Sequence, residues 1–250
     1  GSPAGREGGR ARAHEEHGAS VEDRGRERAV LTFAVGGGRD VGAALEAACA
    51  LSGATSCFET LDWEEDPVES VENWEATASS DGFETVTIGK LRICPVQRYE
   101  EVPPGLVEMR LLEGQGWGDG EHPSTWMCLD FLEKEMKGGE REVVDYGTGS
   151  GVLATAAALL GARHVTAIDL DVEILTHARQ NFLVNGVGGR VTALHTREVS
   201  IGDLSGEVVV VNMMAGPMLT LLATLVLAVE DGGVLCLSGL RPSDVPVVKR

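Results

Sequence analysis

The chain has 250 residues, of which 43 % are hydrophobic, and it carries a formal net charge of −18. This length suffices for one large domain, or for a large domain with a small one. The acidic excess argues against a nucleic-acid substrate, because nucleic-acid-binding proteins usually present a basic face. It is compatible with a small cofactor, with a basic protein partner, or with solubility alone. The apolar runs fall short of the roughly 20 residues that a membrane-spanning helix needs, so we expect no membrane contact.

Cysteine usage argues against a disulfide framework and against a zinc site. The five cysteines lie far apart, their number is odd, and none forms a CxxC pair. We therefore expect no metal, and we interpret most of these cysteines as small buried hydrophobic residues in a reducing compartment.

The first 115 residues divide into three segments. Residues 1–28 hold six Arg and six acidic residues but almost no large apolar side chain, which predicts disorder and argues against an organelle transit peptide. Residues 29–61 predict a small α/β unit with a helix over 40–53. Residues 62–115 predict a linker, a hairpin that turns at Gly89-Lys90, and a third strand with the sequence LVEMRLL.

Residues 116–250 predict a catalytic domain in which strands and helices alternate. Helices are expected at 124–139, 151–162, 171–186 and 216–229, and strands at 142–147, 164–170, 190–196, 207–213 and 232–239. Strands that are apolar throughout and alternate with helices indicate a mainly parallel, doubly wound α/β sheet. The last residues resemble the first turns of a helix, so we expect the natural protein to continue and the sheet to lack its final strands. The strand containing VLCLS would then be an exposed apolar edge.

A glycine-rich segment, DYGTGSG, follows the first strand of this sheet. Asp145, Gly147, Gly149 and Gly151 lie in it, and Asp169 ends the next strand, 22 residues after Gly147. Glycines let a backbone turn sharply and approach a ligand, and a carboxylate at the next strand end can accept hydrogen bonds from ribose hydroxyls. The spacing predicts that these five residues bind an adenosine-containing cofactor. A tight structural turn without a ligand is the alternative.

The turn reads GxGxG, whereas dinucleotide-binding folds prefer GxGxxG. We therefore favour S-adenosylmethionine, which has no pyrophosphate, as the cofactor of a methyltransferase. A NAD-dependent oxidoreductase and a non-catalytic binding module remain as alternatives.

Two further positions are candidates for the reacting end of the site. Asn212, at the end of the fourth strand, is suited to hold a substrate amine or the cofactor, or to cap the next helix. His122 fits a structural hydrogen bond that shapes its loop better than a general base or a metal ligand. Trp117 is expected to shield the site or to pack in the core, and Met213 and Met214 are expected to fill the core.

Several motifs resemble those of the PrmA-type ribosomal protein methyltransferases, over residues 71–241. WGDGEHPST is similar to that family's FGTGTHPTT, VVDYGTGSGVLA to VIDFGCGSGILA, and VVVVNMMAGPM to VVVANILAGPL. The resemblance implies a class I S-adenosylmethionine-dependent methyltransferase fold with a small α+β N-terminal unit. It implies a cofactor site that includes Thr125, Gly147, Asp169 and Asn212, and methylation of lysine or N-terminal amino groups of large-subunit ribosomal protein eleven.

The resemblance also shapes the remaining expectations. Residues 29–61 provide about half of the family's substrate-recognition domain. Asn212 is expected to orient the neutral amine without a dedicated general base, and the loop 116–126 is expected to close over the cofactor. We expect a monomer that takes a basic protein substrate, in the cytoplasm, or in a chloroplast or mitochondrion if the source is eukaryotic.

Overall fold

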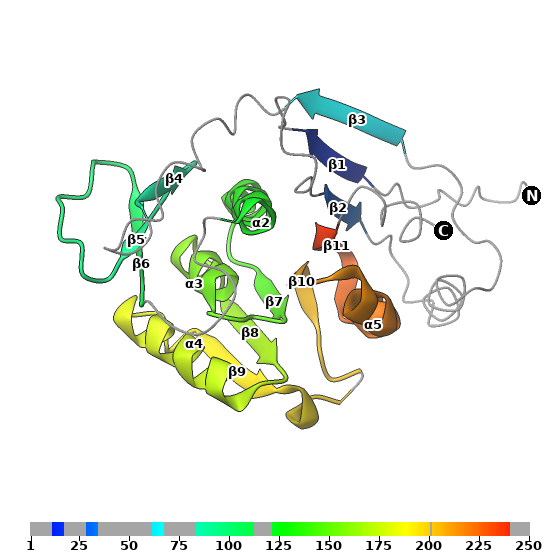
Figure 1. Cartoon of the computed structure of the whole chain (residues 1–250). Helices are drawn as coiled ribbons and strands as arrows, with labels where there is room; N and C mark the ends of the chain where they lie inside the picture. The colour runs from blue at the N-terminus through cyan, green and yellow to red at the C-terminus, as the bar shows by residue number, and fades with distance from the viewer. Residues whose placement is uncertain are drawn as a thin grey trace, which may run out of the picture.

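The computed structural model describes residues 84–112, 122–200 and 202–240 with their side chains, and the backbones of three more strands. Its main element is a six-stranded sheet in the order β2-β11-β10-β7-β8-β9 (Figure 1). The strands are β2 (Ala29–Ala34), β7 (Glu142–Tyr146), β8 (His164–Asp169), β9 (Val191–His195), β10 (Gly206–Asn212) and β11 (Val229–Leu240).

The sheet is doubly wound, as the sequence predicts. β7 lies in the middle, the chain steps outward through β8 to β9, and it then crosses back to place β10 and β11 on the other side of β7. All neighbouring pairs from β9 to β11 are parallel. The four valines of β10 are fully buried, which is typical of a parallel strand covered on both faces.

Helices cover both faces of this sheet. The helices are α2 (Pro123–Glu135), α3 (Val152–Leu159), α4 (Val172–Val184) and α5 (Ala215–Leu227), with short 3-10 turns at Met136–Gly138 and Thr196–Glu198. Side chains of α2, α3 and α4 share one buried cluster with Val143, whereas α5 shares a second cluster with Val144. Because successive side chains of a strand point to opposite faces, α5 lies on the opposite side of the sheet from the other three helices.

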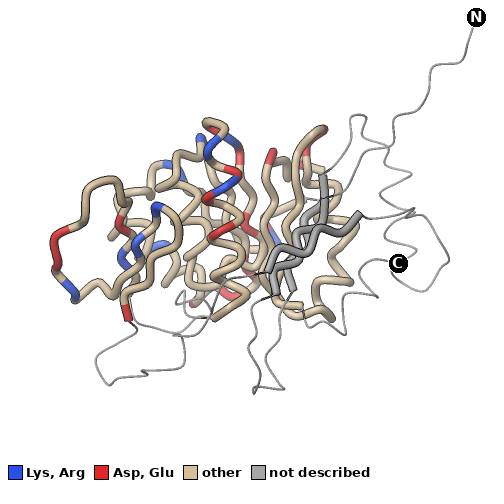
Figure 2. Tube along the Cα trace, turned by 90° about the horizontal axis from the view of Figure 1, so that it is seen from above, with Lys and Arg blue, Asp and Glu red and all other residues tan. Residues whose placement is uncertain are grey.

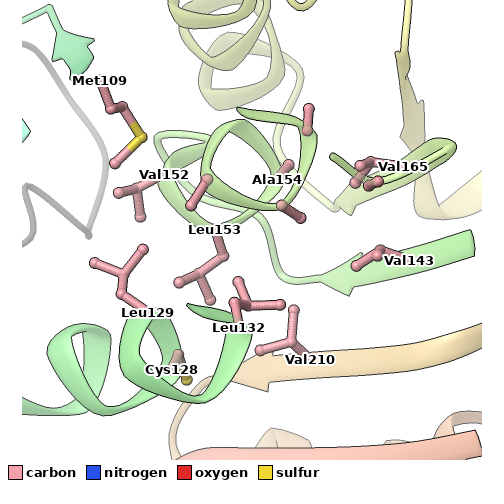
Figure 3. Close-up of a cluster of buried hydrophobic side chains, with 14 of the residues drawn as sticks. Met109, Cys128, Leu129, Leu132, Val143, Val152, Leu153, Ala154, Val165 and Val210 are labelled. Atoms are coloured by element: carbon pink, nitrogen blue, oxygen red, sulfur yellow. The ribbon is translucent and has the colours of Figure 1, made fainter. Parts of the chain in front are cut away.

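Helix α3 is enclosed on every side. Its residues Val152 to Ala158 are all buried, as expected for a helix that is apolar all round. Figure 3 shows Leu153 between Leu129 and Leu132 of α2, and Val152 next to Met109 of the smaller sheet. The start of α3, which follows the glycine-rich segment, is therefore fixed by packing from several elements.

A three-stranded sheet packs against α3 and α4. It contains β4 (Val86–Ile88), β5 (Leu91–Pro95) and β6 (Val107–Leu111), in that order. β4 and β5 are antiparallel and turn at Gly89 and Lys90, which confirms the predicted hairpin. The guanidinium of Arg92 is buried in β5 and pairs with the carboxylates of Glu100 and Glu108.

The N-terminal strands differ from the sequence-based expectation. β11 is not an exposed edge, because β2 pairs with it in antiparallel fashion. Residues 12–17, inside the segment predicted to be disordered, form β1 (Arg12–His17), which pairs with β3 (Asp62–Pro67). Backbone ladders need no apolar side chains, so composition gave no signal for this pairing. The predicted helix over 40–53 and the segment 241–250 lie outside the described residues.

No helix in the described part of the chain has the length and apolar character to cross a bilayer.

Candidate functional site

The candidate site lies at the edge of the sheet where β7, β8 and β10 end. These strands end at Tyr146, Asp169 and Asn212. After β7 the chain enters α3 on one face of the sheet, and after β10 it enters α5 on the other. This reversal between β7 and β10 is the topological switch point at which open α/β sheets bind their ligands.

The glycine turn, residues 147–151, requires glycine for its conformation and, at Gly151, also for space. Gly147, Gly149 and Gly151 have φ angles of 82°, 54° and 81°. A Cβ atom on Gly151 would lie 2.6 Å from Cε1 of Phe182, and one on Gly147 would lie 2.9 Å from Cε of Met213. At Gly151 the backbone therefore lies closer to the Phe182 ring than a Cβ atom permits, whereas the end of the flexible Met213 side chain can move away from a Cβ on Gly147.

Asp169 joins the end of β8 to the glycine turn. Its Oδ2 accepts a hydrogen bond of 2.9 Å from the Gly149 amide. Its Oδ1 accepts from the amides of Leu170 and Asp171, at 2.8 and 3.1 Å. A carboxylate oxygen has two lone pairs, so Oδ2 retains room for one more donor, such as a hydroxyl.

Asp145, near the end of β7, is fully buried and contacts the turn. Its Oδ2 accepts hydrogen bonds from the Thr148 hydroxyl at 2.7 Å and from the Ala154 amide at 3.0 Å. Its Oδ1 is buried without a hydrogen-bond partner among the described residues. Burial raises the pKa of Asp145 from 3.8 to about 7, and the negative charge of Asp169 adds to the increase. Asp145 thus holds the turn to the first turn of α3.

Asn212 and Thr125 meet although 87 positions separate them. The side-chain amide nitrogen of Asn212 donates a hydrogen bond of 3.2 Å to the Thr125 hydroxyl, and Thr125 is only 2 % exposed. Asn212 does not cap the next helix, because the residue at the cap of α5 is Met214. The alternative capping role for Asn212 is therefore wrong.

His122 makes the structural hydrogen bond that the sequence favours. It caps α2, where its Nδ1 accepts from the Ser124 amide at 3.3 Å and lies 2.6 Å from the Ser124 hydroxyl oxygen. A histidine with this role fixes the start of the helix that carries Thr125. Within the described ranges, no three His, Cys, Asp or Glu residues are grouped as a metal site would require.

Two buried polar residues that hydrogen-bond to segments of the site were not predicted from the sequence. Ser238 is fully buried at the end of β11, where its hydroxyl donates to the Ser124 carbonyl at 2.9 Å and its carbonyl accepts from the Met213 amide. Asn181 is also fully buried, in α4, and donates to the Ser150 carbonyl in the glycine turn. The only signal in the sequence is a polar residue at a position that the apolar pattern places in the core.

Other predicted residues lie at or beyond the margin of the site. Met214 is 75 % exposed, so the expectation that it fills the core is wrong, whereas Met213 packs against the cluster around α5. The loop predicted to close over the cofactor lies mostly outside the described residues, and so does Trp117. Cys94, Cys128 and Cys236 are buried free thiols, as expected.

Comparisons with known proteins agree with this architecture. The protein named ribosomal protein L11 methyltransferase of Shewanella baltica (strain OS185) is 40 % identical over 162 residues, which cover 64 % of this chain and 54 % of the relative. The protein of that name from Shewanella pealeana is 39 % identical over 177 residues, which cover 69 % of this chain and 59 % of the relative. The chain thus spans little more than half the length of these curated relatives.

A solved structure and a family model extend the comparison. The crystal structure of a ribosomal protein L11 methylase from Lactobacillus delbrueckii subsp. bulgaricus superposes with a TM-score of 0.59 at 27 % identity, covering 67 % of this chain and 86 % of that one. The family model described as ribosomal protein L11 methyltransferase (PrmA) matches residues 46–249. Because this match covers most of the sequence, as the motifs indicated, the chain belongs to the ribosomal protein L11 methyltransferase (PrmA) family.

Proposed function

We propose that this chain is an S-adenosylmethionine-dependent protein methyltransferase that acts on amino groups of a ribosomal protein, namely L11. One observation carries the proposal. The Asn212–Thr125 pair lies at the same sheet edge as the glycine turn and Asp169, at the switch point of the sheet. Membership of the family supports the choice of substrate, since relatives carry the name ribosomal protein L11 methyltransferase.

The charge around the glycine turn favours a cationic cofactor over a dinucleotide. Asp145 and Asp169 both contact the turn or its flanks, and the Ala154 amide in the first turn of α3 already donates to Asp145. A pyrophosphate needs free amides at a helix N-terminus and would meet a carboxylate here. S-adenosylmethionine carries a sulfonium and an ammonium, and a carboxylate such as that of Asp169 is a favourable neighbour for positive charge.

Each part of the site then has a role toward this cofactor. We assign the glycine turn (Gly147, Gly149 and Gly151) to the methionine end and Asp169 to the ribose hydroxyls. Asp145, buried at the end of β7, supports the turn through its bonds to Thr148 and Ala154. When bound, S-adenosylmethionine supplies a methyl group on a sulfonium, which an amine can take by in-line displacement.

Asn212 is proposed to orient the substrate amine. Its amide nitrogen donates to Thr125, so its Oδ1 is the atom that would accept a hydrogen from the incoming amine. The amine must be neutral to react, and a free lysine with a pKa of about 10.4 is less than about 0.1 % neutral at pH 7. A site that excludes water disfavours the ammonium and so raises the neutral fraction. Positioning and desolvation therefore suffice in this proposal, without a dedicated base.

The test is methyl transfer from labelled S-adenosylmethionine to purified ribosomal protein L11, followed by mass spectrometry of the product. Tight NAD binding with no affinity for S-adenosylmethionine would instead favour the oxidoreductase. Cofactor binding without transfer to any ribosomal protein would favour the non-catalytic module.

An Asn212→Ala variant examines the proposed role of the amide. Loss of an orienting group should lower kcat about 10- to 100-fold. Cofactor affinity should fall less than kcat does, because the glycine turn and Asp169 are intact. Thr220→Ala, an exposed position on α5, provides the control. Normal turnover in Asn212→Ala would refute the assignment.

The net charge of −18 suits a basic protein substrate. Figure 2 shows acidic and basic positions interspersed along the described trace, so the attraction is expected to be diffuse rather than confined to one face. The KM for the protein substrate should therefore rise with ionic strength while the cofactor KM changes little. We further propose a cytoplasmic monomer that makes no direct contact with nucleic acid.

A further inference from the structure

Asn181 of α4 and Asn185, the C-cap residue of this helix, bind the outer edge of β6 and the residue that follows it. Asn185 accepts from the Arg110 amide at 2.8 Å and donates to the Arg110 carbonyl at 2.7 Å. Asn181, one helical turn earlier, accepts from the Leu112 amide at 2.8 Å. β6 is an edge strand of its sheet, and its outer backbone groups need partners. The two side chains provide them from one face of the helix.

The two asparagines differ in what else they hold. Among the described residues, the amide nitrogen of Asn185 otherwise donates only to the Asn181 carbonyl in α4. The amide nitrogen of Asn181 donates 2.9 Å across to the Ser150 carbonyl, in the glycine turn. Asn181 therefore joins the turn to Leu112, which directly follows β6. Its orientation is settled by its partners, since one is a donor and the other an acceptor.

We propose that Asn181 is a positioning residue for the cofactor site, which holds the glycine turn in register with the end of β6. Ser150 stands between two glycines with positive φ, so the turn has little intrinsic stiffness. A fully buried side-chain amide supplies the acceptor and the donor that the two segments need. This inference rests on the proposed function, because it takes the turn to be the cofactor-binding element.

The first test compares Asn181→Ala with Asn185→Ala in the full chain, using calorimetric titration with S-adenosylhomocysteine. Each variant loses part-buried hydrogen bonds to β6 or to the residue that follows it, so both should have a lower melting temperature. Only Asn181→Ala should also raise the Kd, by about tenfold or more, because it alone frees the glycine turn. Asn185→Ala should stay within about twofold of the unmodified chain.

The outcomes separate the inference from the function on which it rests. Equal Kd values for all three proteins would overturn the positioning role while leaving the cofactor site in place. Equally raised Kd values in both variants would also overturn it, because they would indicate a general effect of loosening β6. Failure of the unmodified chain to bind S-adenosylhomocysteine would overturn both proposals.

Hydrogen exchange on the unmodified chain keeps the inference testable if Asn181→Ala does not fold. Saturation with S-adenosylhomocysteine should slow exchange of the Leu112 amide by about fivefold, because this amide is joined to the turn through Asn181. The Arg110 amide, bound to Asn185, should change by less than about twofold. Equal responses of the two amides would contradict the proposal.

Discussion

Replacing Gly151 with alanine tests how closely the glycine turn packs against α4. The added Cβ would lie 2.6 Å from Cε1 of Phe182, in a backbone with φ of 81°. The left-handed conformation costs a non-glycine residue about 1–2 kcal/mol. Forcing a methyl group into a packed core costs about another 1–3 kcal/mol. We expect a total loss of about 2–5 kcal/mol in the free energy of unfolding.

Gly186→Ala is the matched control for that substitution. Gly186 also has a positive φ, 66°, but a Cβ there would meet nothing within 4 Å. It should therefore lose only the conformational part, about 1–2 kcal/mol. Urea unfolding of both variants measures the difference, and Phe182→Leu in the Gly151→Ala background should recover part of it. Equal losses in the two single variants would show that Phe182 does not restrict the turn.

The remaining predictions concern two buried polar groups. Because burial raises the pKa of Asp145 from 3.8 to about 7, the folded protein holds this proton more tightly than the unfolded chain. The stabilisation from this proton is complete below about pH 4 and is lost as the pH rises through 7. Between pH 5 and 8, the free energy of unfolding of the unmodified chain should therefore fall by about 2–3 kcal/mol more than that of Asp145→Asn, as measured by urea unfolding. Parallel pH profiles would contradict the shifted pKa. Ser238→Ala removes the donor to the Ser124 carbonyl and should lower the free energy of unfolding by about 1–2 kcal/mol; an unchanged melting temperature would show that this bond contributes nothing.

Local patterns were sufficient to predict the helices and strands from residue 123 to 240. Strands such as β10 carry an unbroken apolar run, and glycines or helix caps mark their ends, so each element could be assigned within its own segment. Doubly wound topology followed from the alternation, because right-handed crossovers leave few other arrangements. The glycine turn and Asp169 could be placed at one sheet edge for the same reason.

Pairings between residues far apart in the chain could not be predicted from local sequence patterns. Nothing in residues 29–34 indicates that they pair with β11, some 200 positions later, because any strand can complete a backbone ladder. The partners of Asn181 were also hidden, since helical periodicity shows only that this position faces inward. A buried asparagine in an apolar position implies that it has partners, but not which ones they are.

The two halves of the doubly wound sheet provide hydrogen bonds to different parts of the candidate site. Asn181 holds the glycine turn from α4, on the side of β8 and β9, whereas Ser238 holds the start of α2 and the end of β10 from β11. The glycine turn and Asp169 therefore belong to one half. Asn212, assigned to the amine, and Thr125, which the family resemblance places in the cofactor site, belong to the other. The strands from both halves meet only at the switch point. A substitution of Asn181 should therefore displace the glycine turn first, and a substitution of Ser238 should displace the start of α2 first. This division explains why buried polar residues occur in both halves of the core, although each one adds a desolvation cost.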